Sequence, residues 1–510
     1  MKHRVLRSVF NRKMLIFLLL LLQIASIIFI VVAQSLKSQL FGVVLQAIGF
    51  VIAVRIIVKR GESAYKFTWL FVVIILPVFG TLFYLLFNYQ SSSKRFSEGV
   101  RNSEEHMRKY INLAGSDLET AVKKHPEFSI NFRYLEKCSF PVFSGTEAEY
   151  LPIGEQMFAE LKLALESAEK YIFMEYFIVR EGDMWREIFE ILAKKAEQGV
   201  IVKVMYDDIG SFFGLPKNFR TTLKKYKIEC AVFNPFRPML ISMQNNRDHR
   251  KITSVDGKTA FTGGINISDE YINKISPFGH WKDSGVKLHG KAAWALTSMF
   301  LQMWEFATRE KPDYDFFYPY KDTPCTVKGA GFFQPYMDSP TDAEDVGEHV
   351  YMQIINNARD YLYITTPYLI IDDKMLGALA LAAKSGVDVR IVTPHVADKK
   401  FVHATTRSYY MELIEAGVTI YEYTEGFIHA KTFVSDDKIA VVGTTNLDFR
   451  SLYLHFECGV VIYDNPVVAA VRDDFKKIIS VSEKVSAAQC KAKIFKRIWQ
   501  AFLRLFAPLM

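Results

Sequence analysis

The sequence predicts an α/β protein of two similar halves, preceded by apolar transmembrane helices. Three observations predict this fold class. A pattern of His, Lys, Asp, Gly and Asn occurs twice, and 180 positions separate its two copies. Short runs rich in β-branched and aromatic residues alternate with helix-like stretches in both halves. Long apolar runs occupy the first 90 residues.

Residues 1–90 form the expected membrane region, with apolar stretches at about 14–33, 40–58 and 67–87. The first has 20 residues without a charge, which is enough to cross a bilayer. A cleaved signal peptide is the alternative, but this apolar region is too long for one. In the second stretch Arg55 lies near the end, where it can snorkel. The third contains Pro77 and Gly80. We therefore expect two or three spans in a multi-pass membrane protein.

The distribution of Lys and Arg bears on the orientation of these spans. Residues 1–13 carry five of them, residues 34–39 one and residues 59–66 three. The positive-inside rule therefore places the N-terminus and the 59–66 loop in the cytoplasm. Three spans would put the rest of the chain outside the cytoplasm and two spans would put it inside. The sequence leaves both arrangements open.

Composition agrees with a membrane-bound protein. The 510 residues include 63 Lys and Arg against 55 Asp and Glu, a net charge of +8, with bases gathered beside the apolar segments at both ends. That placement suits an anionic membrane surface. The basic, amphipathic segment 486–510 can lie on the membrane interface or pack on the domain, and its Trp and Phe residues favour the interface. Five scattered cysteines without a C-x2-C pair indicate neither a disulfide framework nor a zinc site.

The repeat extends beyond the motif and defines the expected domains. They are a connector at 91–135, a first half at 136–310, a linker at 311–330 and a second half at 331–485. The first half has a strand-like run at 171–178, a helix-like stretch at 185–198 and a Gly-led strand at 199–204. The second half repeats these three elements in the same order at 361–368, 374–385 and 386–391. This alternation predicts mixed, largely parallel sheets.

The two motif copies carry the chemistry. They consist of His249, Lys251, Asp256, Gly263 and Asn266, and of His429, Lys431, Asp436, Gly443 and Asn446. In an extended segment residues i and i+2 face the same side, so each His projects into a pocket together with its Lys. A neutral imidazole can attack phosphorus, and a second, protonated imidazole can protonate the departing alkoxide. One His cannot do both in line, so the two copies are expected to form one phosphodiester-cleaving site.

H-x-K-x4-D followed by G-x2-N resembles the signature of the phospholipase D superfamily, and both copies match it. The surrounding segments 263–271, 281–283 and 446–451 resemble bacterial cardiolipin synthases. The similarity runs from about residue 65 to the C-terminus. It implies two phospholipase D-like α/β halves related by a pseudo-two-fold axis, with the site between them, in a bacterial cell membrane.

The resemblance also implies roles for the histidines and lysines. In this family the N-terminal motif supplies the nucleophile, so His249 is expected to attack and form a phosphatidyl-histidine. His429 would then be the acid, and later the base that activates the incoming alcohol. The sequence does not break the pseudo-symmetry, so the reverse assignment stays open. Lys251 and Lys431 are expected to hold the phosphoryl oxygens.

The remaining motif residues are less directly tied to the chemistry. Asn266 and Asn446 are candidate donors to the phosphoryl oxygens, and their alternative is a turn-forming Asn after Gly. Asp256 and Asp436 give the motif its name. We expect them to tie a strand end to its neighbours rather than to act chemically.

Supporting residues follow from the same resemblance. A catalytic His needs a carboxylate to fix its tautomer, and in this superfamily that carboxylate follows its motif, as Glu457 does after His429 and Asp283 in the first half. Ser268 and Ser451 lie where the family has hydroxyls near the pocket, although helix caps are an equal alternative. The family usually has Asn where this chain has His455.

The expected reaction transfers a phosphatidyl group from one phosphatidylglycerol to a hydroxyl of another, giving cardiolipin and glycerol. The new phosphodiester replaces one of similar energy, so no nucleotide is needed, and no metal-ligand motif indicates a cofactor. Both lipids are the expected partners, whereas a nuclease has no reason to carry membrane spans, so no nucleic acid is expected. Alternatives are a phosphatidyltransferase or hydrolase using serine, another alcohol or water. A non-catalytic membrane scaffold is a further alternative, which the intact motifs argue against.

Overall fold

The computed structural model describes residues 12–59, 61–88, 91–236, 242–491 and 493–509. The first part of the basic N-terminal flank, residues 1–11, lies outside the described residues. The chain divides into two compact units. One draws on Met1–Glu98, Phe236–Asn245 and Ala501–Met510, and the other on Gly99–Pro235 and Asn246–Gln500. The second unit holds both motif copies.

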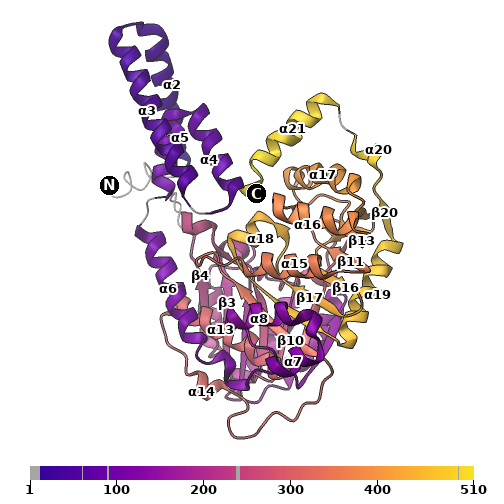
Figure 1. Ribbon diagram of the computed structural model, residues 1–510. Coiled ribbons are helices and arrows are strands. Elements are labelled where there is room, and N and C mark those ends of the chain that lie inside the picture. The colour runs from indigo at the N-terminus through magenta and orange to yellow at the C-terminus, as the bar shows by residue number, and fades with distance from the viewer. Residues whose placement is uncertain (1–11, 60, 89–90, 237–241, 492, 510) are drawn as a thin grey trace. The chain divides into compact units, whose positions relative to one another are not determined.

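Two long apolar helices begin the first unit, α2 (Arg12–Ala33) and α3 (Leu36–Val58) (Figure 1). By length and composition both can cross a membrane, over 20 residues in α2 and 23 in α3. The Ser35 side chain caps α3 by accepting the backbone N–H of Ser38. Most side chains of both helices are exposed, as lipid-facing positions are. These helices agree with the first two expected spans.

The third apolar stretch, 67–87, does not form the single span that the sequence predicted. The chain forms two shorter helices there, α4 (Ser63–Ile75) and α5 (Pro77–Asn88). Pro77 has no backbone N–H and disfavours helical dihedrals in the residue before it. Leu76 accordingly has φ −123° and ψ 71°, and α4 ends at this point. In the described residues only α2 and α3 are long enough to span.

The helices α4 and α5 fold back on each other. The ring of Trp69 in α4 lies 5.2 Å from that of Tyr84 and 5.8 Å from that of Phe87 in α5, between centroids. Gly80 permits this approach, because a Cβ there would lie 2.5 Å from the carbonyl oxygen of Val72. At the start of α5, Gln23 of α2 accepts the backbone N–H groups of residues 78 and 79 at 3.0 Å. A polar interruption of the first span therefore satisfies two donors of a neighbouring helix.

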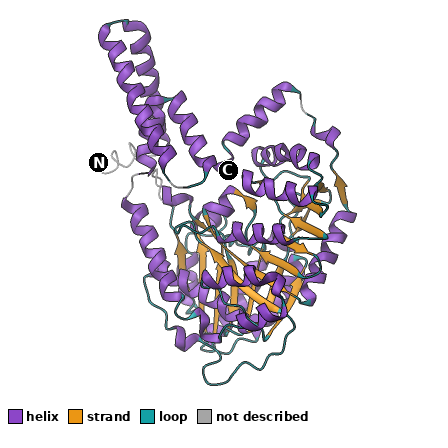
Figure 2. Cartoon of the chain, in the orientation of Figure 1, coloured by secondary structure: helices purple, strands orange, loops and turns teal. Residues whose placement is uncertain are grey.

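The second unit contains two mixed sheets (Figures 1 and 2). Their strand orders correspond over seven strands, and the second sheet has a further strand at one edge. The first sheet runs β1 (Thr146–Leu151), β9 (Gly285–Gly290), β7 (Thr259–Gly263), β6 (Lys251–Val255), β2 (Tyr171–Tyr176), β3 (Ile201–Asp207), β4 (Glu229–Phe233). The second runs β10 (Phe332–Asp338), β19 (His455–Tyr463), β17 (Ile439–Gly443), β16 (Thr432–Ser435), β11 (Tyr361–Thr365), β13 (Asp388–Pro394), β14 (Thr419–Tyr423), β20 (Ser482–Lys484). In each sheet three consecutive strands are parallel, β2–β3–β4 and β11–β13–β14. The expected two α/β halves are confirmed.

Helices cover both sheets. Those of the first half are α9 (Gly154–Glu166), α10 (Asp183–Glu197), α11 (Asp208–Ser211), α12 (Phe219–Lys225) and α13 (Lys291–Thr308). Those of the second are α15 (Val346–Asn357), α16 (Asp373–Lys384), α17 (Lys400–Glu415), α18 (Phe449–Tyr453) and α19 (Pro466–Ser480). Helix α10 buries Trp185, Ile188 and Leu192 on one face and exposes charged residues on the other, which is why this stretch is helical. Strand β2 is buried along its whole length.

Helices also occur in each of the connecting segments. The connector holds α6 (Ser91–Met107), α7 (Leu118–Lys124) and α8 (Ser129–Lys137), the linker holds α14 (Tyr314–Phe317), and the C-terminal segment holds α20 (Ala487–Cys490) and α21 (Ile494–Leu505).

The two halves meet through β7, which contacts β17 and β19. At this boundary Thr262 Oγ1 lies 3.4 Å from Cys458 Sγ. Helix α13 is buried nearly all round and packs both on its own sheet and on β10 of the second half. Two short parallel strand pairs also cross the boundary, β5 (Arg247–Asp248) with β19 and β15 (Gly426–Ile428) with β8 (His280–Lys282).

Candidate active site

The two crossing strand pairs place each motif histidine beside a carboxylate of the other half. His249 directly follows β5 and donates its backbone N–H to the carbonyl of the residue before Glu457, at 2.9 Å. His429 directly follows β15 and donates its N–H to the carbonyl of the residue before Asp283, at 2.7 Å. The same backbone arrangement is thus built twice, once in each direction across the pseudo-two-fold axis.

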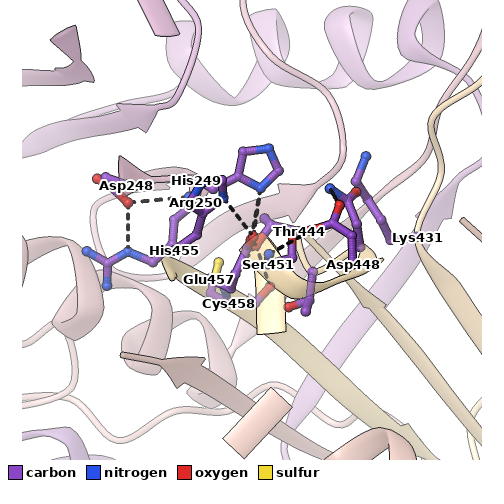
Figure 3. A network of polar contacts seen from close by, with 12 residues as sticks. Asp248, His249, Arg250, Lys431, Thr444, Asp448, Ser451, His455, Glu457 and Cys458 are labelled. Carbon is purple, nitrogen blue, oxygen red and sulfur yellow. Dashed lines mark hydrogen bonds and ion pairs between the residues drawn. The ribbon is translucent and has the colours of Figure 1, made fainter. Parts of the chain in front are cut away.

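The side chains complete these pairs. His249 Nδ1 lies 2.9 and 3.0 Å from the two carboxylate oxygens of Glu457 (Figure 3). His429 Nδ1 lies 2.6 Å from Asp283 Oδ2. Both carboxylates are fully buried. Because an ionised carboxylate only accepts, Nδ1 of each ring carries the proton and Nε2 keeps its lone pair. Each imidazole therefore has the tautomer that nucleophilic attack or proton acceptance needs.

This pairing differs from the expectation that each carboxylate serves the histidine of its own motif. Glu457 of the second half binds His249 of the first, and Asp283 of the first half binds His429 of the second. The reason is the register of β5 on β19 and of β15 on β8, which joins segments far apart in the chain.

The two lysines are buried beside the histidines. Lys251 Nζ donates to the backbone carbonyl of His249, and Lys431 Nζ donates to that of His429 and lies 2.8 Å from its Nδ1. Burial lowers the pKa of Lys251 to about 8 and that of Lys431 to about 7. An anionic phosphodiester entering the site would restore the charge of both lysines, since it supplies a counter-ion in place of the water that burial removes.

Burial also keeps the imidazoles neutral. It lowers the pKa of His249 well below the ordinary value, and nearby Lys251 and Lys431 lower it further. The pKa of His429 falls to about 4 through burial and Lys431, although Asp283 opposes the shift. Burial alone would raise the pKa of Asp283, but Lys431 and His429 outweigh it and lower this pKa. Before substrate enters, both rings are therefore bases rather than acids.

The motif aspartates do not face the histidines. Asp256 accepts the backbone N–H groups of residues 169–171 at 2.7 to 2.8 Å, at the start of β2. Asp436 accepts those of residues 359–361 at 2.8 to 2.9 Å, at the start of β11. Both adopt left-handed backbone conformations, with φ 52° and 55°. They anchor strand ends, at the opposite end of β2 and β11 from the histidines, and are not placed for a chemical step.

The two motif asparagines lie in different surroundings. Asn266 Oδ1 accepts the N–H of Ile178 at 2.9 Å, and its Nδ2 donates to the Tyr271 hydroxyl at 2.7 Å. Asn446 Nδ2 donates to Asp448 at 3.1 Å, whereas its Oδ1 is buried without a hydrogen-bond partner in the part of the chain that the structure describes. Each amide nitrogen has one further N–H for a phosphoryl oxygen.

The two serines also differ from each other. The Ser268 hydroxyl donates to the carboxylate of Glu270. Ser451 lies in the first turn of α18, where Asp448 caps its backbone N–H at 2.8 Å (Figure 3). Its hydroxyl is buried and, within the described residues, makes no hydrogen bond. Neither serine side chain caps a helix.

Thr444 is a support that sequence reasoning missed. Its hydroxyl donates to Glu457 (Figure 3). The matching position of the first motif is Gly264, where a Cβ would collide with Asp283. The signal was present in the sequence as a Gly-to-Thr difference between the repeats, matched by the Asp-to-Glu difference between the carboxylates.

His455, which stands where the resembling family usually has Asn, lies beside His249. Its ring centroid lies 5.4 Å from that of His249, and its Nδ1 lies 3.8 Å from Glu457 Oε1, beyond hydrogen-bond distance. Burial lowers its pKa to about 3. Ligand atoms of His249, His455 and Glu457 lie within 4.8 Å of one another, a set that could coordinate a divalent ion. The positive charges of the two nearby lysines would oppose such an ion.

Comparison with known proteins gives three findings. Residues 161–304 and 351–479 match the family described as "Cardiolipin synthase, PLD-like domain", and residues 47–87 match "Phospholipase_D-nuclease N-terminal". The chain is 42% identical to a Streptococcus mutans protein over 87% of this chain and 96% of that one. It is 35% identical to cardiolipin synthase 2 of Bacillus cereus over 90% of both chains, and 33% identical to a cardiolipin synthase of Halalkalibacterium halodurans over 92% and 94%.

Among solved structures, phosphatidylserine synthase of Haemophilus influenzae Rd KW20 matches with a TM-score of 0.57. The match covers 74% of this chain and 97% of that chain at 15% sequence identity. At this identity the likeness concerns the fold alone.

Proposed function

The chain belongs to the bacterial cardiolipin synthase family of the phospholipase D superfamily and is a phosphatidyltransferase, and on this premise we propose its reaction and mechanism. It transfers a phosphatidyl group from one phosphatidylglycerol to a hydroxyl of a second, giving cardiolipin and glycerol. Helices α2 and α3 anchor it in the bacterial cell membrane, where both lipids reside. With two spans and a cytoplasmic N-terminus, the catalytic unit faces the cytoplasm.

In the first step Nε2 of His249 attacks the phosphorus of the donor lipid. A P–N bond forms, the P–O bond to glycerol breaks, and His429 gives its proton to the departing oxygen. His429 acquires this proton when the substrate enters, because the phosphate anion raises the proton affinity of the site. Lys251 and Lys431 hold the non-bridging oxygens, and the spare N–H groups of Asn266 and Asn446 assist them.

In the second step the acceptor hydroxyl loses its proton to His429 and attacks phosphorus. The P–N bond breaks, a new P–O bond forms, and His249 returns to its neutral state. Glu457 stabilises the phosphatidyl-histidine, which is cationic at the ring. No energy input is needed, since one phosphodiester replaces another.

The observation that carries this proposal is the pair of buried carboxylates on the two histidines, each of which leaves Nε2 unprotonated. The choice of His249 as nucleophile is supported by charge. Burial and both lysines lower the pKa of each ring, and at His429 the buried Asp283 partly opposes this shift. The more basic ring is the better proton carrier.

The test is turnover of purified protein in mixed micelles with phosphatidylglycerol as the sole lipid. We expect cardiolipin and glycerol in equal amounts, and loss of both in His249→Ala and in His429→Ala. His289→Ala is the matched control, because this first-half histidine lies outside the site and contacts Thr259. Phosphatidic acid in place of cardiolipin would mean that water is the acceptor. No turnover with any acceptor would contradict the proposal.

A lipid with a p-nitrophenol leaving group separates the two histidines. Such a leaving group departs without a proton, so His429→Ala should still release p-nitrophenol and accumulate a phosphatidyl-histidine. His249→Ala should release none. The opposite result would make His429 the nucleophile.

A further inference from the structure

Two loops occupy equivalent places beside the histidines. Strand β3 precedes one of them and β13 the other, and these strands are equivalent in the two sheets. Tyr176 at the end of β2 pairs with Lys251, and Thr365 at the end of β11 pairs with Thr432. The carboxyl ends of β2 and β11 therefore lie at the edge where the histidines enter. Because β3 and β13 run parallel to these strands, both loops leave from that same edge.

The loop after β3, whose first turn is the short helix α11, exposes large apolar side chains. Ile209 is 39% exposed, Phe212 55% and Phe213 96%. The backbone that carries them is held in place, since Asp207 accepts the N–H groups of Ile209 and Gly210 at 2.9 and 3.0 Å. Asp207 thus fixes the first turn of this segment, and Phe213 projects from the end of it into solvent.

A buried ion pair connects this loop to strand β5, which directly precedes His249. Asp207 also binds the Arg247 guanidinium at 2.9 Å, two residues before His249. Both side chains are buried. The position of the loop is therefore linked to the position of the nucleophile.

The loop after β13 has a similar character. Phe401, at the start of α17, is 65% exposed, and Lys399 and Lys400 directly precede it. The loop is held by Tyr368, whose hydroxyl donates to Asp398 at 2.6 Å. The ring of Phe401 lies 6.5 Å from that of Trp499 in the amphipathic helix α21. Bases and aromatic rings side by side are typical of protein surfaces that contact anionic lipid.

We propose that these two rim loops, residues 209–213 and 399–401, dock the catalytic unit on the surface of an anionic bilayer. This inference rests on the proposed function, since the phosphate to be attacked lies in the headgroup layer of that bilayer. The aromatic rings enter the headgroup and acyl boundary on both sides of the site, and the lysines contact lipid phosphates. A protein partner that covered both loops would close the route by which a lipid reaches the histidines, so the bilayer is the occupant.

The test uses the full-length protein with two substrates. One is long-chain phosphatidylglycerol in reconstituted vesicles, and the other is dihexanoyl phosphatidylglycerol dispersed as monomers, with the protein in detergent. The double variant Phe213→Ser and Phe401→Ser should form cardiolipin about tenfold more slowly in vesicles, because two apolar side chains no longer enter the interface. On the dispersed lipid its rate should stay within about twofold of wild type.

Matched controls are Leu163→Ser on α9 and Leu381→Ser on α16, which are 60% and 63% exposed. Leu163 lies near the end of α9, shortly before β2 begins, and Leu381 lies near the end of α16, shortly before β13 begins. Both residues are therefore at the edge of their sheet that is opposite the histidines. They should change neither rate. An equal fall of the rim-loop variant on both substrates, or no fall in vesicles, would overturn the proposal.

A second measurement does not depend on turnover. Phe213→Trp adds a fluorophore to the rim, and phosphatidylglycerol brominated on its acyl chains should quench this added emission in vesicles. Leu163→Trp should add emission that the same lipid does not quench. Unquenched Phe213→Trp emission would overturn docking, whereas quenching together with an inactive wild type would contradict the proposed function and leave docking supported.

Discussion

Replacing Glu457 by Gln changes the charge of the group that orients His249 and nearly preserves its volume. Glu457 is fully buried, lies within 3.0 Å of His249 Nδ1 through both oxygens, and accepts the hydroxyl of Thr444. A Gln that keeps the Thr444 contact through its oxygen turns its amide N–H groups toward Nδ1. The ring would then carry its proton on Nε2, where the attacking lone pair is needed.

The expected magnitude follows from burial. In the proposed covalent intermediate the phosphorylated ring of His249 is a cation, and its buried counter-ion in wild type is Glu457. Removing one partner of a buried ion pair costs about 3–5 kcal/mol. That loss corresponds to a fall of about 10²- to 10⁴-fold in kcat. The fold should persist, because the variant keeps a polar group of the same size.

The assay compares Glu457→Gln with Asp283→Asn, on phosphatidylglycerol and on the p-nitrophenol lipid. Glu457→Gln should stay slow with the activated leaving group, because it impairs the nucleophile. Asp283→Asn should recover with that leaving group, because it impairs the proton donor His429. Thermal melts of both variants check that the protein is folded. Recovery of Glu457→Gln and not of Asp283→Asn would refute the combination of the crossed pairing with His249 as the nucleophile.

Three further outcomes follow from the structure. Asp256→Ala leaves three backbone N–H groups without an acceptor and should destabilise the fold by about 2–4 kcal/mol in thermal melts, with kcat per folded molecule unchanged. The pKa of Lys431 is lowered to about 7, so its ammonium is present below that pH and lost above it. The kcat/KM of the enzyme should therefore fall above pH 7. Lys431→Arg should move this fall to higher pH in a pH profile, because a guanidinium keeps its charge. Gly80→Leu should open the α4–α5 hairpin, seen as new protease cleavage near Leu76 in detergent, and full protection would contradict the packing.

Much of the fold was predictable because its signals are local. The strand-like runs at 171–178 and 361–368 and the helices at 185–198 and 374–385 appear in the structure with ends displaced by a few residues. Each reflects side-chain periodicity within one segment. The third apolar stretch was predicted wrongly, since hydropathy alone does not register that Pro77 interrupts the helix and Gly80 lets its two parts pack together.

The sequence by itself determined the α/β halves, the two apolar helices and the His–Lys pairs, because repeats, periodicity and an i, i+2 spacing are properties of neighbouring residues. Only the tertiary structure decided which carboxylate serves which histidine. It also decided that Thr444 donates to Glu457 and that the ring of His455 lies beside that of His249. It also decided that the loops after β3 and β13 share an edge with the site. These relations depend on strand register between segments about 150 to 200 residues apart in the chain, and register is set by the packing of whole sheets rather than by any short stretch.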